Sequence, residues 1–197
     1  DDPLIELAKK ENIQYFRGSE KNKIKRWADC FTHYDIDNAI LVDGDDLTFD
    51  YNVAKRALNL LQNSNVDLVT SSTEMTPGFF TYGITSIGIE KLVKTAPDTN
   101  IDTDVITEFI KCANLSKSCV EANDNETDGH NVRLTIDYEE DLMFYRKVYS
   151  RANYLLPGPE IVQTILKYGL QKINWHKNED FINNQQAFNQ NIKEQII

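Results

Sequence analysis

The sequence has few of the residues that build disulfide frameworks and zinc sites. Only three cysteines occur in 197 residues, at Cys30, Cys112 and Cys119, and there are only three histidines. The number of cysteines is odd and none of them form a CxxC pair, so both a disulfide framework and a tetrahedral zinc site are disfavoured. Reduced thiols are typical of a cytosolic protein, and we therefore expect a cytoplasmic location.

Long apolar runs and positive charge are also scarce. No stretch of about 18 apolar residues predicts a membrane span, and no signal peptide is recognisable. The 21 Lys and Arg residues against 31 Asp and Glu residues give a net charge of −10. A general nucleic-acid binder needs a basic face, so that class is disfavoured. Nucleotide substrates remain open, because acidic groups can hold a metal that in turn holds phosphate.

What remains is the composition of a globular domain, with 41% hydrophobic and 26% charged residues. A chain of this length can bury about 70% of its unfolded surface. Apolar periodicity predicts helices at 2–10, 22–34, 51–62, 89–94, 103–112, 138–150 and 160–168. It predicts strands at 13–16, 39–42, 66–70 and 132–136, and a strand or hairpin at 79–87. This alternation predicts an α/β fold with a mainly parallel sheet.

The chain is expected to divide near residue 150. Residues 1–150 would form the α/β core, and residues 151–197 a C-terminal helical segment with a tail rich in Asn and Gln. That composition predicts that the last twenty residues are weakly ordered or form an arm resting on the body.

Aspartates follow two of the expected strands. The cluster Asp43–Asp46 follows the strand 39–42, and Asp137 follows the strand 132–136. Ligands of open α/β sheets bind beyond the carboxyl ends of the strands, and Mg²⁺ binds one or two carboxylates together with substrate phosphates. Asp45 and Asp137 are therefore candidate metal ligands. The alternative is that these aspartates serve only as turn residues and helix caps.

Three arginines are candidate ligand-binding residues. Arg17 precedes Gly18 at the end of an expected strand, where a guanidinium group can bind phosphate through two nitrogens. Arg26 follows on the next helix, and the lysines between them fit a solvated helix face. Arg133 lies inside an expected strand and should be paired with an acidic residue or a ligand.

Three segments, taken together, resemble a known family. They are DDPLIELAKKENIQYFRGSEKN with the following Arg26, ILVDGDDLTFD, and NVRLTIDYEEDLMFYRKVY. Their order and spacing are similar to those of the cytidylyltransferases that make CMP-activated sugars. The pattern is most similar to the spore-coat polysaccharide cytidylyltransferase-like proteins, and the CMP-Kdo and CMP-sialic acid synthetases are more distant. The resemblance covers about residues 1–174, and its third segment is the most specific.

The resemblance implies a Rossmann-like, GT-A-like nucleotidyltransferase fold. It also implies an enzyme of surface polysaccharide or glycan synthesis that uses CTP and Mg²⁺, transfers CMP to an acidic sugar and releases pyrophosphate. A homodimer is implied as well. By position, Asp45 and Asp137 match the metal-binding aspartates of the family. The residues that match the nucleotide and substrate cleft are Arg17, Gly18, Ser19 and Arg26, to which we add Arg133.

The sequence departs from the family pattern at several places. Leu47 stands where the family usually has proline, and Tyr138 and Glu139 stand where it usually has Thr-Pro. The family begins with a strand and a loop rich in Gly, Arg and Lys that wraps the triphosphate of CTP. Because the sequence opens on a later helix, the resemblance predicts an N-terminal portion, with these strands and the triphosphate loop, that lies outside it.

Two other functions stay open. Asp43-Gly44-Asp45 also matches the DxD metal motif of GT-A glycosyltransferases that use sugar nucleotides. The acidic turn after Asp137 favours a cytidylyltransferase over that alternative. The third hypothesis is a non-catalytic binding or assembly module.

Overall fold

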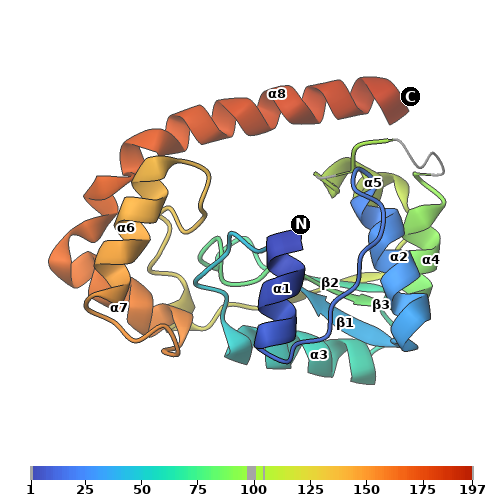
Figure 1. Cartoon of the computed structure of the whole chain (residues 1–197), viewed down its shortest axis with the longest axis horizontal. Helices are drawn as coiled ribbons and strands as arrows, with labels where there is room; N and C mark the ends of the chain where they lie inside the picture. The colour runs from blue at the N-terminus through green and yellow to red at the C-terminus, as the bar shows by residue number, and fades with distance from the viewer. Residues whose placement is uncertain (1, 97–100, 104, 197) are drawn as a thin grey trace.

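The computed structural model describes residues 2–96, 101–103 and 105–196, with side chains described as far as residue 190. A four-stranded sheet lies among helices (Figure 1). The strands, in the order β1-β3-β2-β4 across the sheet, are β1 (Asn38–Leu41), β3 (Tyr82–Thr85), β2 (Leu68–Ser71) and β4 (Lys117–Val120). β2 pairs in parallel with β4, and β3 pairs antiparallel with both β1 and β2. The expected α/β class is confirmed: three of these four strands share one direction, and β3 is reversed between two of them.

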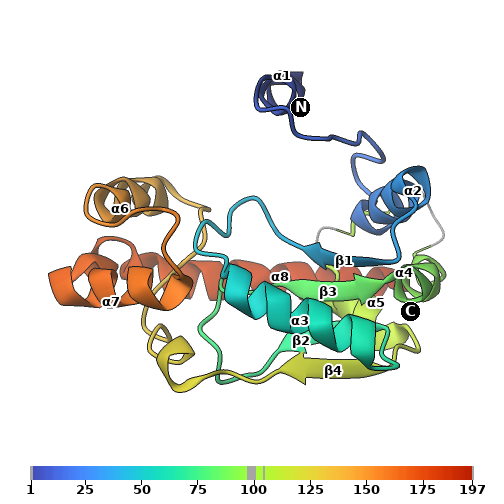
Figure 2. The same ribbon diagram turned by 90° about the horizontal axis from the view of Figure 1, so that it is seen from below.

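Two cores form on the two faces of this sheet. Successive side chains of a strand point to opposite faces, so Leu68 and Val69 of β2 enter different cores. Val69 packs into the core that contains residues of α3, and Leu68 packs into the core with α2, α4 and α5. Figure 2 shows α3 lying along the sheet. The bounds of these helices are α2 (Lys23–Tyr34), α3 (Tyr51–Asn63), α4 (Ser86–Val93) and α5 (Thr107–Cys112).

Polar side chains fix where the helices of the sheet half begin. The Asn22 side chain accepts a hydrogen bond of 2.8 Å from the backbone N–H of Lys25 and so caps α2. Asp50 caps α3 in the same way, and its second oxygen accepts a 2.7 Å hydrogen bond from the backbone N–H of Gly158. One buried carboxylate therefore joins the start of α3 to the start of α7 (Gly158–Tyr168).

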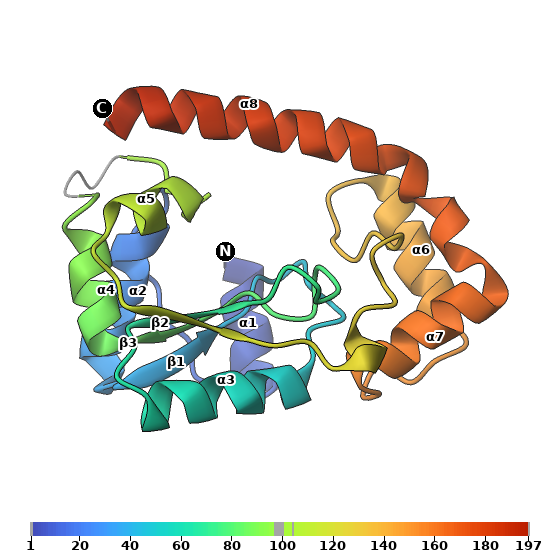
Figure 3. The ribbon, with the colours of Figure 1, turned by 180° about the vertical axis from the view of Figure 1, so that it is seen from behind.

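The C-terminal half is helical. Its elements are α6 (Glu139–Tyr149), α7, η2 (Leu170–Ile173), η3 (Trp175–Lys177) and α8 (Asn178–Ile196); the acidic loop before it holds η1 (Asp124–Glu126). Phe144 of α6 and Ile161 of α7 join the core under α3, so this half packs on the sheet half. Figures 1 and 3 show α8 running across the molecule from α6 toward α5. Phe188 of α8 packs against the core of α2, α4 and α5, so residues 178–196 form a helical arm on the body.

Two expected strands are wrong. Residues 13–16 and 132–136 have no strand structure. In the first segment Ile13 and Tyr15 are exposed, and the chain simply links α1 (Asp2–Lys10) to α2. In the second, Val132 and Leu134 enter the core while Arg133 between them is buried in an ionic contact, which imitates the alternation of a strand.

Other helix and strand boundaries differ by a few residues from those expected from the sequence. The helix expected at 103–112 begins at Thr107, and position 104 lies outside the described residues. β4 was missed because its sequence, Lys-Ser-Cys-Val, is mostly polar, and it becomes a strand through parallel pairing with β2. Within the described part of the chain, no helix has the length and apolar character that crossing a membrane requires.

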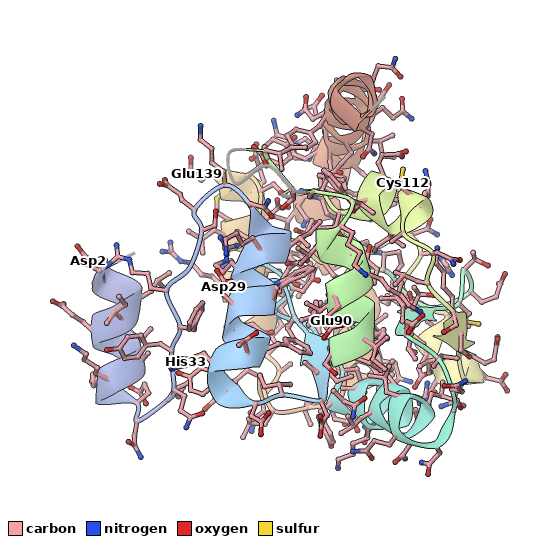
Figure 4. All side chains as sticks on the ribbon, turned by 90° about the vertical axis from the view of Figure 1, so that its right-hand side faces the viewer. Asp2, Asp29, His33, Glu90, Cys112 and Glu139 are labelled. Atoms are coloured by element: carbon pink, nitrogen blue, oxygen red, sulfur yellow. The ribbon has the colours of Figure 1, made fainter. Side chains whose placement is uncertain are left out.

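Helix α1 stands apart from the body. Figure 2 shows it standing away from the sheet, joined to α2 by an extended segment, and none of its described residues is buried. In Figure 4 Asp2 on α1 lies to one side of α2, which carries Asp29 and His33. An exposed ion pair of 2.7 Å between Arg17 and Asp2 ties α1 to the connecting segment. Exposed ion pairs of this kind contribute little to stability.

Candidate functional site

A cavity of about 610 Å³ lies between the sheet half and the helical half. Its lining comes from the loop after β1, the segments 77–82, 105–107 and 130–137 and the first turns of α8, together with Lys23 of α2 and Trp175 of η3. The loop after β1 and the segment 130–137 carry acidic, basic or hydroxyl side chains into the lining, and α8 adds the Phe181 ring, an aliphatic side chain and amides.

One side of the cavity, here called the sheet wall, is made by Asp43, Asp45 and Asp46. They follow directly on β1, as the sequence predicts for a loop at a strand end. The carboxylate of Asp43 pairs with Lys23 at 2.7 Å, and Lys23 also lines the cavity. Asp45 instead accepts a 3.0 Å hydrogen bond from the hydroxyl of Thr135. Of these two, only Asp43 is matched by a cation.

The pKa of Asp46 reflects the electrostatics of the sheet wall. Burial, followed by repulsion from Asp45, Asp43 and Asp137, raises the pKa of Asp46 to about 7. A hydrogen bond from the Thr81 hydroxyl, at 3.2 Å, acts in the opposite direction but is outweighed. The wall therefore carries more negative charge than its own cations neutralise, which is a condition that a bound divalent cation would relieve.

Another side of the cavity is lined by Arg133 and Asp137, with Asp141 and Asn174 buried behind them; these four residues are here called the network wall. The Arg133 side chain is 1% exposed and donates hydrogen bonds to both oxygens of Asp141 and to one oxygen of Asp137. Burial opposes the charged form of Asp141, but Arg133, two backbone N–H groups and Asn174 outweigh it and hold the pKa of Asp141 below its usual range. Asp137 reaches the cavity, and its side chain is 34% exposed.

The two walls are linked by hydroxyl groups. Besides the bond between Thr135 and Asp45, the buried hydroxyl of Tyr145 donates to the backbone oxygen of Leu134 at 3.0 Å. The same hydroxyl shares a 2.8 Å hydrogen bond with Thr48, which follows the sheet wall in sequence. Burial raises the pKa of Tyr145, so this hydroxyl keeps its proton.

Three of the residues predicted for the site meet in this cavity. Asp45, Asp137 and Arg133 all line it, although Asp45 is far from the other two in sequence. Arg26 lines a second cavity of about 470 Å³ together with Trp27, and Asp45 borders both cavities. The two spaces therefore adjoin at Asp45.

The other predicted residues lie outside the linings of both cavities. Arg17 is half-exposed and pairs with Asp2. Gly18 packs closely on Arg26, where an added Cβ would come within 3.0 Å of the Arg26 side chain. The backbone oxygen of Ser19 accepts a 2.6 Å hydrogen bond from Arg26. Arg26 thus orders the segment that contains Gly18 and Ser19.

The carboxylates fit a magnesium ion that also binds a substrate. Among the described residues no group of three or more His, Cys, Asp or Glu side chains is arranged to hold a metal by itself. Mg²⁺ needs less from the protein, because one or two carboxylates, substrate phosphates and water complete its coordination. Asp45 and Asp137 offer hard oxygen ligands in a cavity with excess negative charge.

The sequence pattern does not indicate several residues of the site. The pattern around Lys23 predicts a solvated helix face, and Asn174 and Phe181 carry no recognisable signal. Asp141 had one: it is the third residue of α6, where its carboxylate accepts hydrogen bonds of 2.9 Å from the backbone N–H groups of Asp137 and Tyr138. An acidic residue at this position of a helix is a capping signal.

Comparison with known proteins gives a structural match. No protein-family model and no curated protein matches the sequence. The fold is similar to the solved structure of a cytidylyltransferase from Leptospira borgpetersenii serovar Hardjo-bovis (strain JB197), with a TM-score of 0.72 and 22% sequence identity. The match covers 87% of this chain and 74% of the other. The two proteins share a Rossmann-like α/β fold.

Proposed function

We propose that this protein is a nucleotidyltransferase that transfers CMP from CTP to a sugar hydroxyl and releases pyrophosphate. The shared fold supports nucleotidyl transfer in general. The motifs FRGSE, DGDD and RLTIDYEEDL resemble those of the enzymes that make CMP-sugars, and they point to CTP and, by the same resemblance, to an acidic sugar. A role in surface polysaccharide or glycan synthesis, in the cytoplasm and as a homodimer, belongs to the same proposal.

One observation carries the proposal. Asp45 and Asp137 come from segments far apart in the chain, yet they line one cavity. Thr135 donates to Asp45 and lies two residues before Asp137, so the two carboxylates belong to one connected structure. A magnesium ion bound there would neutralise phosphate charge and lower the barrier to attack on the α-phosphate.

Different residues would serve different roles in this reaction. Asp45 and Asp137 would bind the ion, and Thr135 and Arg133 hold their carboxylates in place. The smaller cavity beside Arg26 and Lys23 offers basic groups next to Asp45 for the nucleotide phosphates. Lys23 is ion-paired with Asp43, and this pair keeps its ammonium group beside the sheet wall.

A GT-A glycosyltransferase is the less supported alternative. Its DxD motif would use the carboxylates of both Asp43 and Asp45. Asp43 is instead paired with Lys23 at 2.7 Å, whereas Asp137 lines the cavity with Asp45. The geometry therefore favours the pair Asp45 and Asp137. No described contact favours a non-catalytic assembly module.

The test measures pyrophosphate release by the full-length protein with CTP, Mg²⁺ and a panel of acidic and neutral sugars. We expect release that depends on CTP, metal and sugar together. Asp45→Asn and Asp137→Asn should each lower kcat about a hundredfold or more, because each removes a metal-binding charge. Asp29→Asn is the matched control, since Asp29 lies on α2 outside both cavities and pairs with Lys25.

Three results would overturn the proposal. One is silence of the full-length protein with every nucleotide and sugar tried. Another is an unchanged rate in both cavity variants. The third is preferential binding of a UDP-sugar or GDP-sugar over CTP, which would restore the glycosyltransferase alternative.

A further inference from the structure

The guanidinium group of Arg133 is the centre of a buried ionic network beside the cavity. Its Nε and Nη2 donate to the two oxygens of Asp141 at 3.0 and 3.1 Å, in the forked geometry that arginine alone provides. The side chains of Arg133 and Asp141 are 1% and 0% exposed. The pair is therefore hidden from solvent, and its geometry does not depend on a ligand.

The same network holds Asp137 at two points. Nη2 of Arg133 also donates to an Oδ of Asp137. The carboxylate of Asp141 accepts from the backbone N–H of Asp137 at 2.9 Å. Asp137 is thus fixed both at its backbone and at its carboxylate, while its side chain remains partly open to the cavity.

Further contacts keep Arg133 itself in place. Asn174 donates to Asp141 at 2.9 Å and to the backbone oxygen of Arg133 at 3.1 Å. The rings of Tyr138 and Phe181 lie 5.1 and 4.5 Å from the guanidinium carbon, so the group is packed against two aromatic rings. These neighbours restrict its rotation and exclude water.

The charges of the network argue against a main role in binding an acidic substrate. One guanidinium faces two carboxylates, Asp137 and Asp141, so the cluster has a net charge of 1 − 2 = −1. An anionic ligand would meet no spare positive charge there, whereas a metal cation would meet the excess negative charge of the cluster. Nη1 of Arg133 is buried with no hydrogen-bond partner among the described residues, so one donor of the guanidinium is left unused by the network.

We propose that Arg133 is a positioning residue that sets the orientation of the Asp137 carboxylate and thereby the affinity of the cavity for its divalent cation. The inference rests on the proposed function, because it takes Asp137 as a metal ligand. Groups that orient the ligands of a metal typically change its affinity by about 10- to 100-fold. Lysine at this position would keep the charge but could not bridge both carboxylates.

The experiment compares Arg133→Lys with Arg56→Lys in the full-length protein. Arg56 makes an equivalent forked pair with Glu126, at 2.8 and 2.6 Å, and lines neither cavity. Mn²⁺ replaces Mg²⁺, so binding can be measured by water-proton relaxation with and without CTP. Thermal unfolding is measured in parallel. We expect both variants to melt earlier, and only Arg133→Lys to bind Mn²⁺ about tenfold more weakly.

Unchanged Mn²⁺ affinity in a folded Arg133→Lys protein overturns the inference, and so does an equal loss in Arg56→Lys. An increased KM for sugar or CTP with unchanged Mn²⁺ affinity assigns Arg133 to substrate binding instead. If Arg133→Lys does not fold, Asn174→Ser loosens the same network at its edge and should weaken Mn²⁺ binding about threefold; unchanged binding overturns the inference.

The proposed function can fail separately from this inference. Mn²⁺ binding that depends on Arg133 and Asp137 without any nucleotidyl transfer contradicts the proposed function and supports the inference. Absence of Mn²⁺ binding to the unaltered protein, with and without CTP, contradicts the inference directly.

Discussion

The two walls of the large cavity hold their carboxylates in opposite ways. On the sheet wall Lys23 pairs with Asp43, while Asp45 and Asp46 each accept one described side-chain hydrogen bond, from a threonine hydroxyl. On the network wall Asp141 is wholly buried and accepts from a guanidinium, an amide and two backbone N–H groups. The sheet wall thus carries negative charge that no paired cation neutralises, and the carboxylates of the network wall are fixed by several hydrogen bonds.

This difference suggests how the site would respond to a cation. The network wall is organised before any ligand arrives, because its bonds are internal and shielded from water. The sheet wall gains most from a bound ion, because its repulsions are relieved only then. The carboxylate of Asp137 is held in place, and the carboxylates of the sheet wall have charge that a cation would neutralise. Together they would form a preorganised arrangement for metal binding.

The largest effect on stability is expected from breaking the network wall. Asn174→Leu removes two donors, to Asp141 and to the backbone of Arg133, inside a buried cluster. We expect a loss of about 2–3 kcal/mol in the free energy of unfolding, measured by urea denaturation. Asn184→Leu is the control, because the Asn184 amide is exposed and bonds only the Tyr138 hydroxyl; its effect should stay within about 0.5 kcal/mol. Equal losses in the two variants would contradict an ordered network wall.

A smaller effect, with a distinct pH dependence, is expected on the sheet wall. The pKa of Asp46 is raised from 3.8 to about 7 in the folded protein. Between these values the folded state holds a proton that the unfolded state has released, so the group lowers stability progressively as pH rises from about 4 to 7. Asp46→Asn cannot ionise and should therefore be the more stable protein at pH 8, by about 1–2 kcal/mol.

Urea denaturation of both proteins from pH 5 to 8 checks this expectation. The difference should shrink toward pH 5, where Asp46 is protonated, and Mg²⁺ at pH 8 should reduce it as well. Contributions from most other titrating groups cancel in the difference between the two proteins. A difference that does not change with pH would mean that the sheet wall carries no excess charge.

The same contrast explains what could be predicted from the sequence. Asp45 lies in a loop after a short apolar strand, and local pattern was enough to find it. The sequence also indicates Arg133 and Asp137, but in an expected strand that does not exist: apolar and polar residues alternate there as in a half-buried strand, whereas Val132, Arg133 and Leu134 are all buried. Asn174 enters the network from a segment far along the chain, and only tertiary packing reveals such a contact.

The smallest effect is expected where the two walls touch. Thr135→Val removes the 3.0 Å hydrogen bond to Asp45, whose partly exposed carboxylate can be hydrated by water instead. We expect a loss of about 0.5 kcal/mol or less in urea denaturation. Thr76→Val is the matched control: the buried Thr76 hydroxyl donates to the backbone oxygen of Glu126 at 2.7 Å and accepts from the backbone N–H of Gly129 at 3.0 Å, so this variant should lose about 2 kcal/mol. A loss at Thr135 as large as that at Thr76 would contradict this expectation, because it would show that water does not replace the hydrogen bond between Thr135 and Asp45.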